Sequence, residues 1–238
     1  MLGESLSPAR IPYDAAGRDW DAWLGTHPLP TNAALDARLA DATTRAGFVA
    51  VCRERGIYHL PTVEFVVALA RTLRRLPGPW LEVGAGRGDL AWAVRGAGVP
   101  IVATDDGSWW PAPLPDDVIR CDLHAALARF QPATVLCVWP PRGTDWPAMF
   151  RSCASVQAYL LIGDGSRGMT GNPATWAGDK GWRRHPLPRL AALGRCRLDA
   201  EGASHTHALL VRRSSRRSYG LAAVMVASGD DDSATGAW

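Results

Sequence analysis

The spacing of apolar residues changes from helical to strand-like near residue 79. Apolar side chains recur three or four positions apart across 32–56 and again across 63–76, and Thr31 and Thr62 stand where capping residues are expected. The first range predicts one or two helices and the second predicts another. We therefore expect residues 1–76 to form an N-terminal helical cap.

After residue 77, short apolar runs alternate with segments of helical spacing. This alternation is typical of βαβ units and predicts an α/β fold, doubly wound, with a mostly parallel seven-stranded sheet covered on both faces. The stretch after residue 165, SRGMTGNPATWAGDKGW, is expected to be a long Gly-rich loop. The last two sheet strands are expected from an antiparallel hairpin formed by 195–202 and 205–213. The other expected strands are 80–83, 100–105, 117–122, 134–140 and 158–165, with helices at 88–98, 123–130 and 146–156.

The composition narrows the class of protein. Hydrophobic residues make up 47% and charged residues 21% of the 238 residues, and the net charge is +3, which are ordinary values for a globular protein. We expect residues 77–213 to form one α/β domain. Residues 214–238 are rich in Ser, Gly and Asp and are expected to be a disordered tail. The chain shows no signal-peptide pattern at its start and no apolar run long enough to span a membrane.

The five cysteines are widely spaced and odd in number. This pattern fits neither a disulfide framework nor a zinc site, so we expect reduced thiols, no metal and a cytoplasmic protein. The basic residues are dispersed, which makes nucleic acid a less favoured partner than a small molecule or peptide. The oligomeric state stays open.

The segment WLEVGAGRG carries three glycines at alternate positions between a strand and a helix. Gly84 would allow a tight turn, Gly86 would leave room for a ligand, and Gly88 would let the helix pack closely. Asp105 follows at the end of the next strand, where a carboxylate can accept both hydroxyls of a ribose. The spacing differs from the dinucleotide pattern G-x-G-x-x-G, and Glu82 would repel a pyrophosphate, which disfavours a dinucleotide oxidoreductase.

The stretch LEVGAGRGDLAWAVRGAGVPIVATD resembles the first two motifs of class I S-adenosylmethionine-dependent methyltransferases, and the resemblance extends over residues 79–213. It implies an enzyme with S-adenosyl-L-methionine as cofactor and S-adenosyl-L-homocysteine as product. The glycine loop and Glu82 would face the methionine part of the cofactor, and Asp105 would bind the ribose. Asp106, Asp122 and Leu123 would lie beside the adenine. The implied cofactor residues are Glu82, Gly84, Ala85, Gly86, Gly88, Asp105, Asp106, Asp122, Leu123 and Trp139.

The fourth motif departs from the amino-methylating members of this family. Those enzymes carry Asn or Asp before Pro-Pro, whereas here Trp139 precedes Pro140 and Pro141. An indole cannot accept a hydrogen bond from an amine, but its face can cover a sulfonium or a substrate ring, or simply close the end of the sheet. A substrate pocket is expected from Trp109, Trp110, Pro140, Asp164 and Trp176.

Methyl transfer needs a base only when the acceptor carries a proton at the working pH. Among the six histidines, His59 is preferred together with Tyr58, because family members often fold the segment before the first motif over the cofactor. The preferred function is methyl transfer to a small molecule or peptide of specialised metabolism in an aromatic-lined pocket. An RNA or protein methyltransferase, and a protein that binds the cofactor without transferring methyl, remain alternatives.

Overall fold

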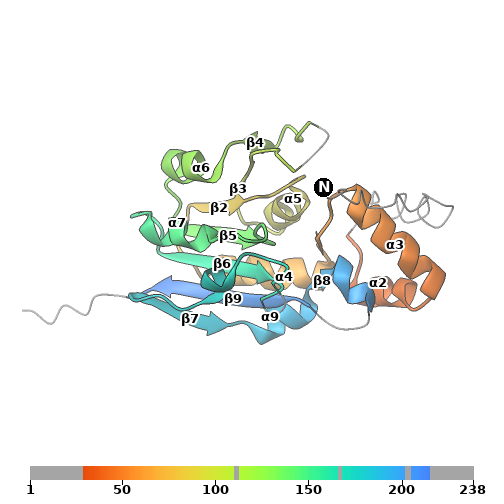
Figure 1. Ribbon diagram of the computed structural model, residues 1–238. Helices are drawn as coiled ribbons and strands as arrows, with labels where there is room; N and C mark the ends of the chain where they lie inside the picture. The colour runs from red at the N-terminus through yellow and green to blue at the C-terminus, as the bar shows by residue number, and fades with distance from the viewer. Residues whose placement is uncertain (1–28, 110–112, 166–167, 202–204, 215–238) are drawn as a thin grey trace, which may run out of the picture.

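The computed structural model describes residues 29–109, 113–165, 168–201 and 205–214 (Figure 1). Residues 1–28 of the expected cap and the expected tail from 215 onward lie outside these ranges. Within the described part of the chain, no helix is long and apolar enough to cross a membrane. The helices are α2 (Asn32–Leu39), α3 (Ala42–Glu54), α4 (Val63–Leu73), α5 (Asp89–Gly96), α6 (Leu123–Phe130), α7 (Trp146–Ser152), α8 (Pro173–Trp176), α9 (Pro188–Leu193) and the 3-10 helix η1 (Arg197–Glu201).

The expected α/β fold with a mostly parallel seven-stranded sheet is confirmed. Its strands run in the order β4-β3-β2-β5-β6-β9-β7, with the first five parallel to one another. β9 is antiparallel to both β6 and β7. The sheet strands are β2 (Trp80–Val83), β3 (Ile101–Asp105), β4 (Val118–Arg120), β5 (Thr134–Val138), β6 (Ala158–Gly163), β7 (Trp182–Pro186) and β9 (His207–Arg213).

Two hydrophobic cores sandwich the sheet, which explains why its central strands are almost wholly apolar. One face packs against α4, α5 and α9 through residues such as Phe65, Val94 and Leu190. The other packs against α6 and α7 through residues such as Leu127 and Phe150. Every residue of β6 is buried, as expected for a strand with a helical layer on each side.

The predicted terminal hairpin is wrong in its first arm. β9 forms as expected, but its edge partner is β7 (182–186), inside the stretch expected to be a long loop. Residues 195–196 form instead the two-residue strand β8, which pairs with β1 (His59–Leu60) in a separate small sheet. Tertiary pairing thus placed β7 beside β9, although residues 195–202 alternate polar and apolar residues and residues 182–186 do not.

The N-terminal helices lie at one end of the sheet. α2 and α3 form a small core of their own around Leu35, Phe48 and Leu60. Figure 1 shows these orange helices at the end of the sheet away from the arrowhead of β9, which is the carboxyl end of the parallel strands. α4, by contrast, packs directly on the main sheet. A domain boundary at residue 76 stays a prediction.

Candidate functional site

Five parallel strands end at one edge of the sheet, and most of the predicted site residues follow those ends. The glycine loop follows β2, Asp105 ends β3, Trp139 follows β5 and Asp164 follows β6. In open α/β sheets this carboxyl edge is where ligands bind. The candidate site therefore lies at this carboxyl edge of the sheet.

The glycine loop adopts a backbone that side chains disfavour. Gly84, Gly86 and Gly88 have φ angles of 63°, 56° and 75°, all left-handed. A Cβ on Gly84 would lie 2.7 Å from the Trp146 ring, and one on Gly88 would lie 2.5 Å from Cγ2 of Val118. A Cβ on Gly86 would meet no atom of the described residues within 4 Å. The loop thus packs tightly at both ends and leaves open space at its middle.

Asp105 holds this loop in place. Its Oδ2 accepts the backbone N–H of Gly86 at 2.8 Å, and its Oδ1 accepts that of Gly107 at 2.7 Å. The backbone N–H of Ala85 also donates to the carbonyl of Thr104 at 3.0 Å. Each carboxylate oxygen keeps a second lone pair, so Asp105 can still accept hydroxyl groups from a ligand.

Glu82 lies beneath the loop in the middle of the sheet and is only 3% exposed. Burial raises the pKa of its carboxyl to about 8, against a smaller opposing effect of Arg95. Its Oε2 is buried and finds no hydrogen-bond partner among the described residues. A carboxyl group in this state is suited to a cationic or hydrogen-bond-donating ligand, which would restore its charge and supply the missing partner.

The other predicted adenine-side residues lie on neighbouring turns. Asp106 is exposed, and its pKa is lowered by a side-chain hydrogen bond from Ser108 and by the backbone N–H of the same serine, which donates to its Oδ1 at 2.8 Å. Asp122 caps α6, where its Oδ1 accepts the N–H of Ala125 at 2.9 Å. Leu123 is half-buried against the second core.

Trp139 combines strain with an aromatic contact. Its φ of 58° is left-handed, a conformation that costs a bulky residue about 1–3 kcal/mol and is enriched at functional sites. Its ring stacks on Tyr58, with centroids 6.0 Å apart and planes at 29°. The buried indole Nε1 has no acceptor in the part of the chain that the structure describes. This contact brings the segment before α4 onto the end of β5, and the role of that segment as a lid stays a prediction.

His59 lines a cavity of about 280 Å³ between that segment and the start of α5. Gly88 and Trp92 line the opposite side. The imidazole packs on Phe65, with ring centroids 4.3 Å apart, and burial lowers its pKa to about 3. Both ring nitrogens are buried without a hydrogen-bond partner in the described ranges. The ring is thus neutral and offers a donor and an acceptor to a ligand in this cavity.

The structure describes four of the five residues expected to line a substrate pocket, and their role there stays a prediction. Trp109 is 76% exposed, and Trp110 lies outside the described residues. The carbonyl of Pro140 accepts the N–H of Gly171, and Asp164 is fully buried. Trp176 packs against the second core and donates its Nε1–H to the carbonyl of Thr170.

Two neighbours of the site were absent from the predicted set. Trp146 lies against Gly84 from the start of α7, and the guanidinium of Arg197 covers Tyr58 at 3.9 Å from its ring centroid. The position of Trp146 in the sequence does favour an aromatic-lined pocket, although no specific role was predicted for it. The contact of Arg197 depends on the pairing of β1 with β8, for which the sequence carries no signal.

The expectation of free thiols is confirmed, because all five cysteines lie in the described ranges and none is in a disulfide. Burial raises the pKa of Cys52 to about 12 and keeps that thiol protonated. No group of three His, Cys, Asp or Glu residues within the described ranges is arranged to hold a metal ion.

Similar folds occur among solved structures of methyltransferases. The chain is similar to a SAM-dependent methyltransferase from Bacteroides fragilis in complex with S-adenosyl-L-homocysteine, at 16% identity over 71% of this chain and 94% of that one, with a TM-score of 0.39. Magnesium protoporphyrin IX methyltransferase from Synechocystis PCC 6803 with bound SAH matches at 16% identity over 85% and 96%, with a TM-score of 0.42. Human N-acetylserotonin methyltransferase in complex with SAM matches at 14% identity over 79% and 61%, with a TM-score of 0.40.

These identities and TM-scores are too low to carry an activity over to this chain. No protein-family model matches the sequence, and a comparison with curated proteins finds no significant match.

Proposed function

We propose that the protein is an S-adenosylmethionine-dependent methyltransferase whose acceptor is a small molecule or a peptide. The observation that carries the proposal is the buried Glu82, whose Oε2 has no partner among the described residues, beneath a left-handed glycine loop. A cationic amino group would ionise this carboxyl and pair with it, whereas a pyrophosphate would bring a second anion to a buried site and favour no such pairing. The glycine pattern, its strand context and Asp105 support the same cofactor.

The residues present fit this cofactor. Open space at Gly86 leaves room for a ligand against the loop, and the orphaned oxygen of Glu82 offers an acceptor for an ammonium group. Asp105 has lone pairs left for two ribose hydroxyls after it has accepted two backbone amides. We assign the adenine side to Asp106, Asp122 and Leu123, which follow the ends of β3 and β4.

S-adenosylmethionine would supply an electrophilic methyl group on a sulfonium. The chain's own part is to bind, align and exclude water, since methyl transfer is an in-line displacement that depends on positioning. We assign Trp139 and Tyr58 to covering this region, because their rings are stacked and join the lid segment to the carboxyl edge. A stacked aromatic pair also suits an apolar or aromatic acceptor.

His59 is assigned to the same lid, facing the 280 Å³ cavity. A pKa near 3 makes its imidazole a weak base in the free protein, because a general base works best with a pKa near the working pH. We therefore propose that its ring nitrogens bind and orient the ligand. Proton transfer by His59 would require a ligand that raises this pKa, by accepting a hydrogen bond from the ring N–H or by carrying a negative charge beside the ring.

Calorimetric titration tests the cofactor. S-adenosyl-L-homocysteine is expected to bind, NAD is expected not to, and Asp105→Ala is expected to weaken binding by about tenfold to 100-fold, because hydrogen bonds to charged groups are worth about 1.5–3 kcal/mol. Glu54→Ala is the matched control, since it removes an exposed carboxylate from the end of α3 that has no assigned role in the site and should change affinity far less.

Binding of NAD without S-adenosylhomocysteine would end the methyltransferase proposal. If the cofactor binds, labelled S-adenosylmethionine incubated with cell extract and followed by mass spectrometry identifies the acceptor. Transfer of label only to RNA would contradict the small-molecule or peptide assignment while leaving the cofactor in place.

A further inference from the structure

A large groove lies at the amino-terminal ends of the parallel strands, opposite the carboxyl ends that carry the candidate site. It has a volume of about 1240 Å³ and is lined where the parallel strands begin, by residues that include Pro77 before β2 and Ala158 at the start of β6. The antiparallel strand β9 ends there, and β7 begins there. The groove is therefore separate from the edge that carries Asp105.

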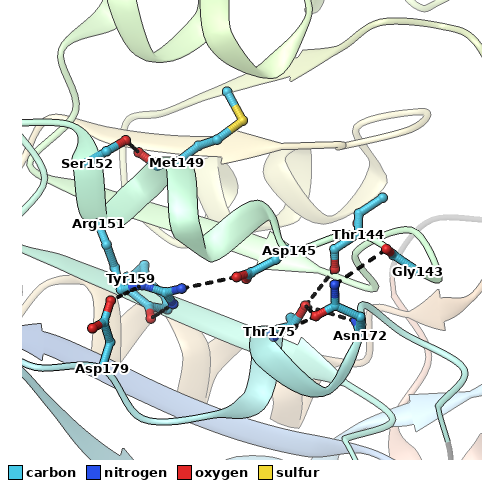
Figure 2. Close-up of polar contacts among 10 residues, drawn as sticks. All are labelled: Gly143, Thr144, Asp145, Met149, Arg151, Ser152, Tyr159, Asn172, Thr175 and Asp179. Atoms are coloured by element: carbon cyan, nitrogen blue, oxygen red, sulfur yellow. Dashed lines mark hydrogen bonds and ion pairs between the residues drawn. The ribbon is translucent and has the colours of Figure 1, made fainter.

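The groove is strongly basic. Its lining holds five basic side chains, Arg151, Lys180, Arg183, Arg212 and Arg213, and one acid, Asp179. Figure 2 shows that this acid is already used, because Arg151 pairs with Asp179 at 2.8 Å and with Asp145 at 3.2 Å. The ion pairs anchor the loop before β7 and leave the remaining positive charge unbalanced.

Two of these arginines stand directly opposite each other. Arg183 of β7 pairs in register with Arg212 of β9, so both side chains lie on the same face of the sheet. Like charges at directly opposed positions destabilise a sheet. No acidic side chain in the described ranges forms a salt bridge with either one. An anionic group bound between them would remove that cost.

β7 is also a free edge of the sheet. Among the described residues it pairs only with β9, and four of its five residues are exposed. The bonds Leu187 N–H to Ala208 O and Ser214 N–H to Gly181 O fix which backbone groups point toward β9. By the alternation of antiparallel pairing, Arg184 turns both its N–H and its C=O outward. This edge can thus accept another strand.

The two observations favour an extended acidic peptide over nucleic acid. Single-stranded nucleic acid binds largely by stacking its bases on open aromatic faces. The groove's one tryptophan, Trp182, has Arg213 over its ring at 4.6 Å and Tyr159 beside it at 5.6 Å. The unpaired backbone of Arg184 suits a peptide, whose own N–H and C=O groups complement it.

We propose that this groove binds an acidic peptide segment of a partner protein, which adds as a strand to the free edge of β7. Side chains of an added strand alternate between the two faces of the sheet. Acidic residues at every second position would therefore all lie on the face of Arg183 and Arg212. The expected partner sequence alternates acidic residues with uncharged ones.

Fluorescence anisotropy with synthetic peptides tests the proposal on the full chain. The probe is an octapeptide of alternating Thr and Glu with a neutral fluorophore. Its block isomer, with four Thr followed by four Glu, has the same composition and charge. The alternating peptide is expected to bind about tenfold more tightly than the block isomer, and N-methylation of alternate backbone nitrogens is expected to abolish binding.

Protein variants locate the binding. Arg183→Gln/Arg212→Gln is expected to weaken binding of the alternating peptide by about tenfold or more. Arg53→Gln/Arg129→Gln removes the same charge from exposed positions on α3 and α6 and is expected to leave it nearly unchanged. Both double variants should retain binding of S-adenosylhomocysteine, which shows that they are folded.

Several outcomes would overturn the proposal. Equal affinity for the two isomers would mean that the groove attracts negative charge without strand addition. Tighter binding of an oligouridylate than of the alternating peptide would assign the groove to nucleic acid. An unchanged affinity of the Arg183→Gln/Arg212→Gln variant would place the peptide elsewhere. Binding that is seen only after removal of residues 215–238 would assign the groove to the chain's own C-terminal segment.

Discussion

Glu82 and His59 both carry buried side-chain atoms without a hydrogen-bond partner in the described part of the chain, yet their surroundings differ. Glu82 lies on β2, which is hydrogen-bonded on both sides by β3 and β5. His59 lies on the two-residue strand β1, whose one partner within the described ranges is β8. Burial favours the neutral form of both groups, because it raises the pKa of Glu82 and lowers the pKa of His59.

The difference divides the site into a rigid half, formed by Glu82, Asp105 and the glycine loop on the main sheet, and a second half, formed by the lid segment with Tyr58 and His59. The glycine loop and Asp105 are fixed by the main sheet, so the orphaned oxygen of Glu82 is held in place before any ligand arrives. The lid is held by a short strand pair and by the contact of Tyr58 with Trp139. We infer that the cofactor end is preorganised and that the lid adjusts to the acceptor.

The largest expected effect is on the rigid half. Gly88→Ala should lower the free energy of unfolding by a strain cost of about 1–3 kcal/mol for its left-handed backbone, and by about 1–3 kcal/mol more for the clash with Val118. Gly86→Ala carries the strain without the clash. Chemical denaturation of both variants measures the difference, and equal stabilities would contradict the tight packing at Gly88.

Glu82→Gln should remove a pH dependence. Since the folded pKa is about 8 against an ordinary 4.5, the folded state keeps a proton that the unfolded state loses. Stability therefore falls as pH rises from about 4.5 to about 8, by up to about 1.4 kcal/mol per pH unit. Denaturation at pH 6.5 and 8 should show this slope in the wild type and a much smaller one in the variant. A slope that survives the substitution would assign it to another group.

His59→Phe should remove a pH dependence of stability with the opposite sign, which can be measured only over a narrow range below about pH 6.5. The unfolded imidazole takes up a proton below about pH 6.5, while the buried ring stays neutral down to about pH 3. Stability therefore decreases as pH falls through this window, by up to about 1.4 kcal/mol per unit. Thermal unfolding between pH 6.5 and 5.5 should be less pH-sensitive in the variant. Identical profiles would mean that the ring is solvated.

The sequence predicted the rigid half better than the lid, for a physical reason. β2, β3, β5 and β6 are largely apolar because they are buried on both faces, and β2, β3 and β6 end at or directly before a glycine or aspartate. That pattern is local and can be read directly. The placement of Glu82 and Asp105 relative to the loop followed from it, although their hydrogen bonds did not.

The remaining elements depend on contacts between distant segments. β7 has the sequence WRRHP and little burial, so hydrophobic alternation gave no sign of a strand. β1 and β8 have two residues each, and their pairing joins segments more than 130 residues apart in the sequence. The stacking of Tyr58 on Trp139 follows from that pairing and could not be predicted from either local sequence.

The free edge of β7 also bears on how the protein behaves at high concentration. An open strand invites the same strand of another copy, which is a common route to aggregation. Here the self-paired arrangement would bring Arg183 and Arg184 against their own counterparts, and Pro186 would offer no N–H to the shared ladder. Charge repulsion therefore disfavours pairing of β7 with the same strand of another copy, whereas a negatively charged strand could still pair with it.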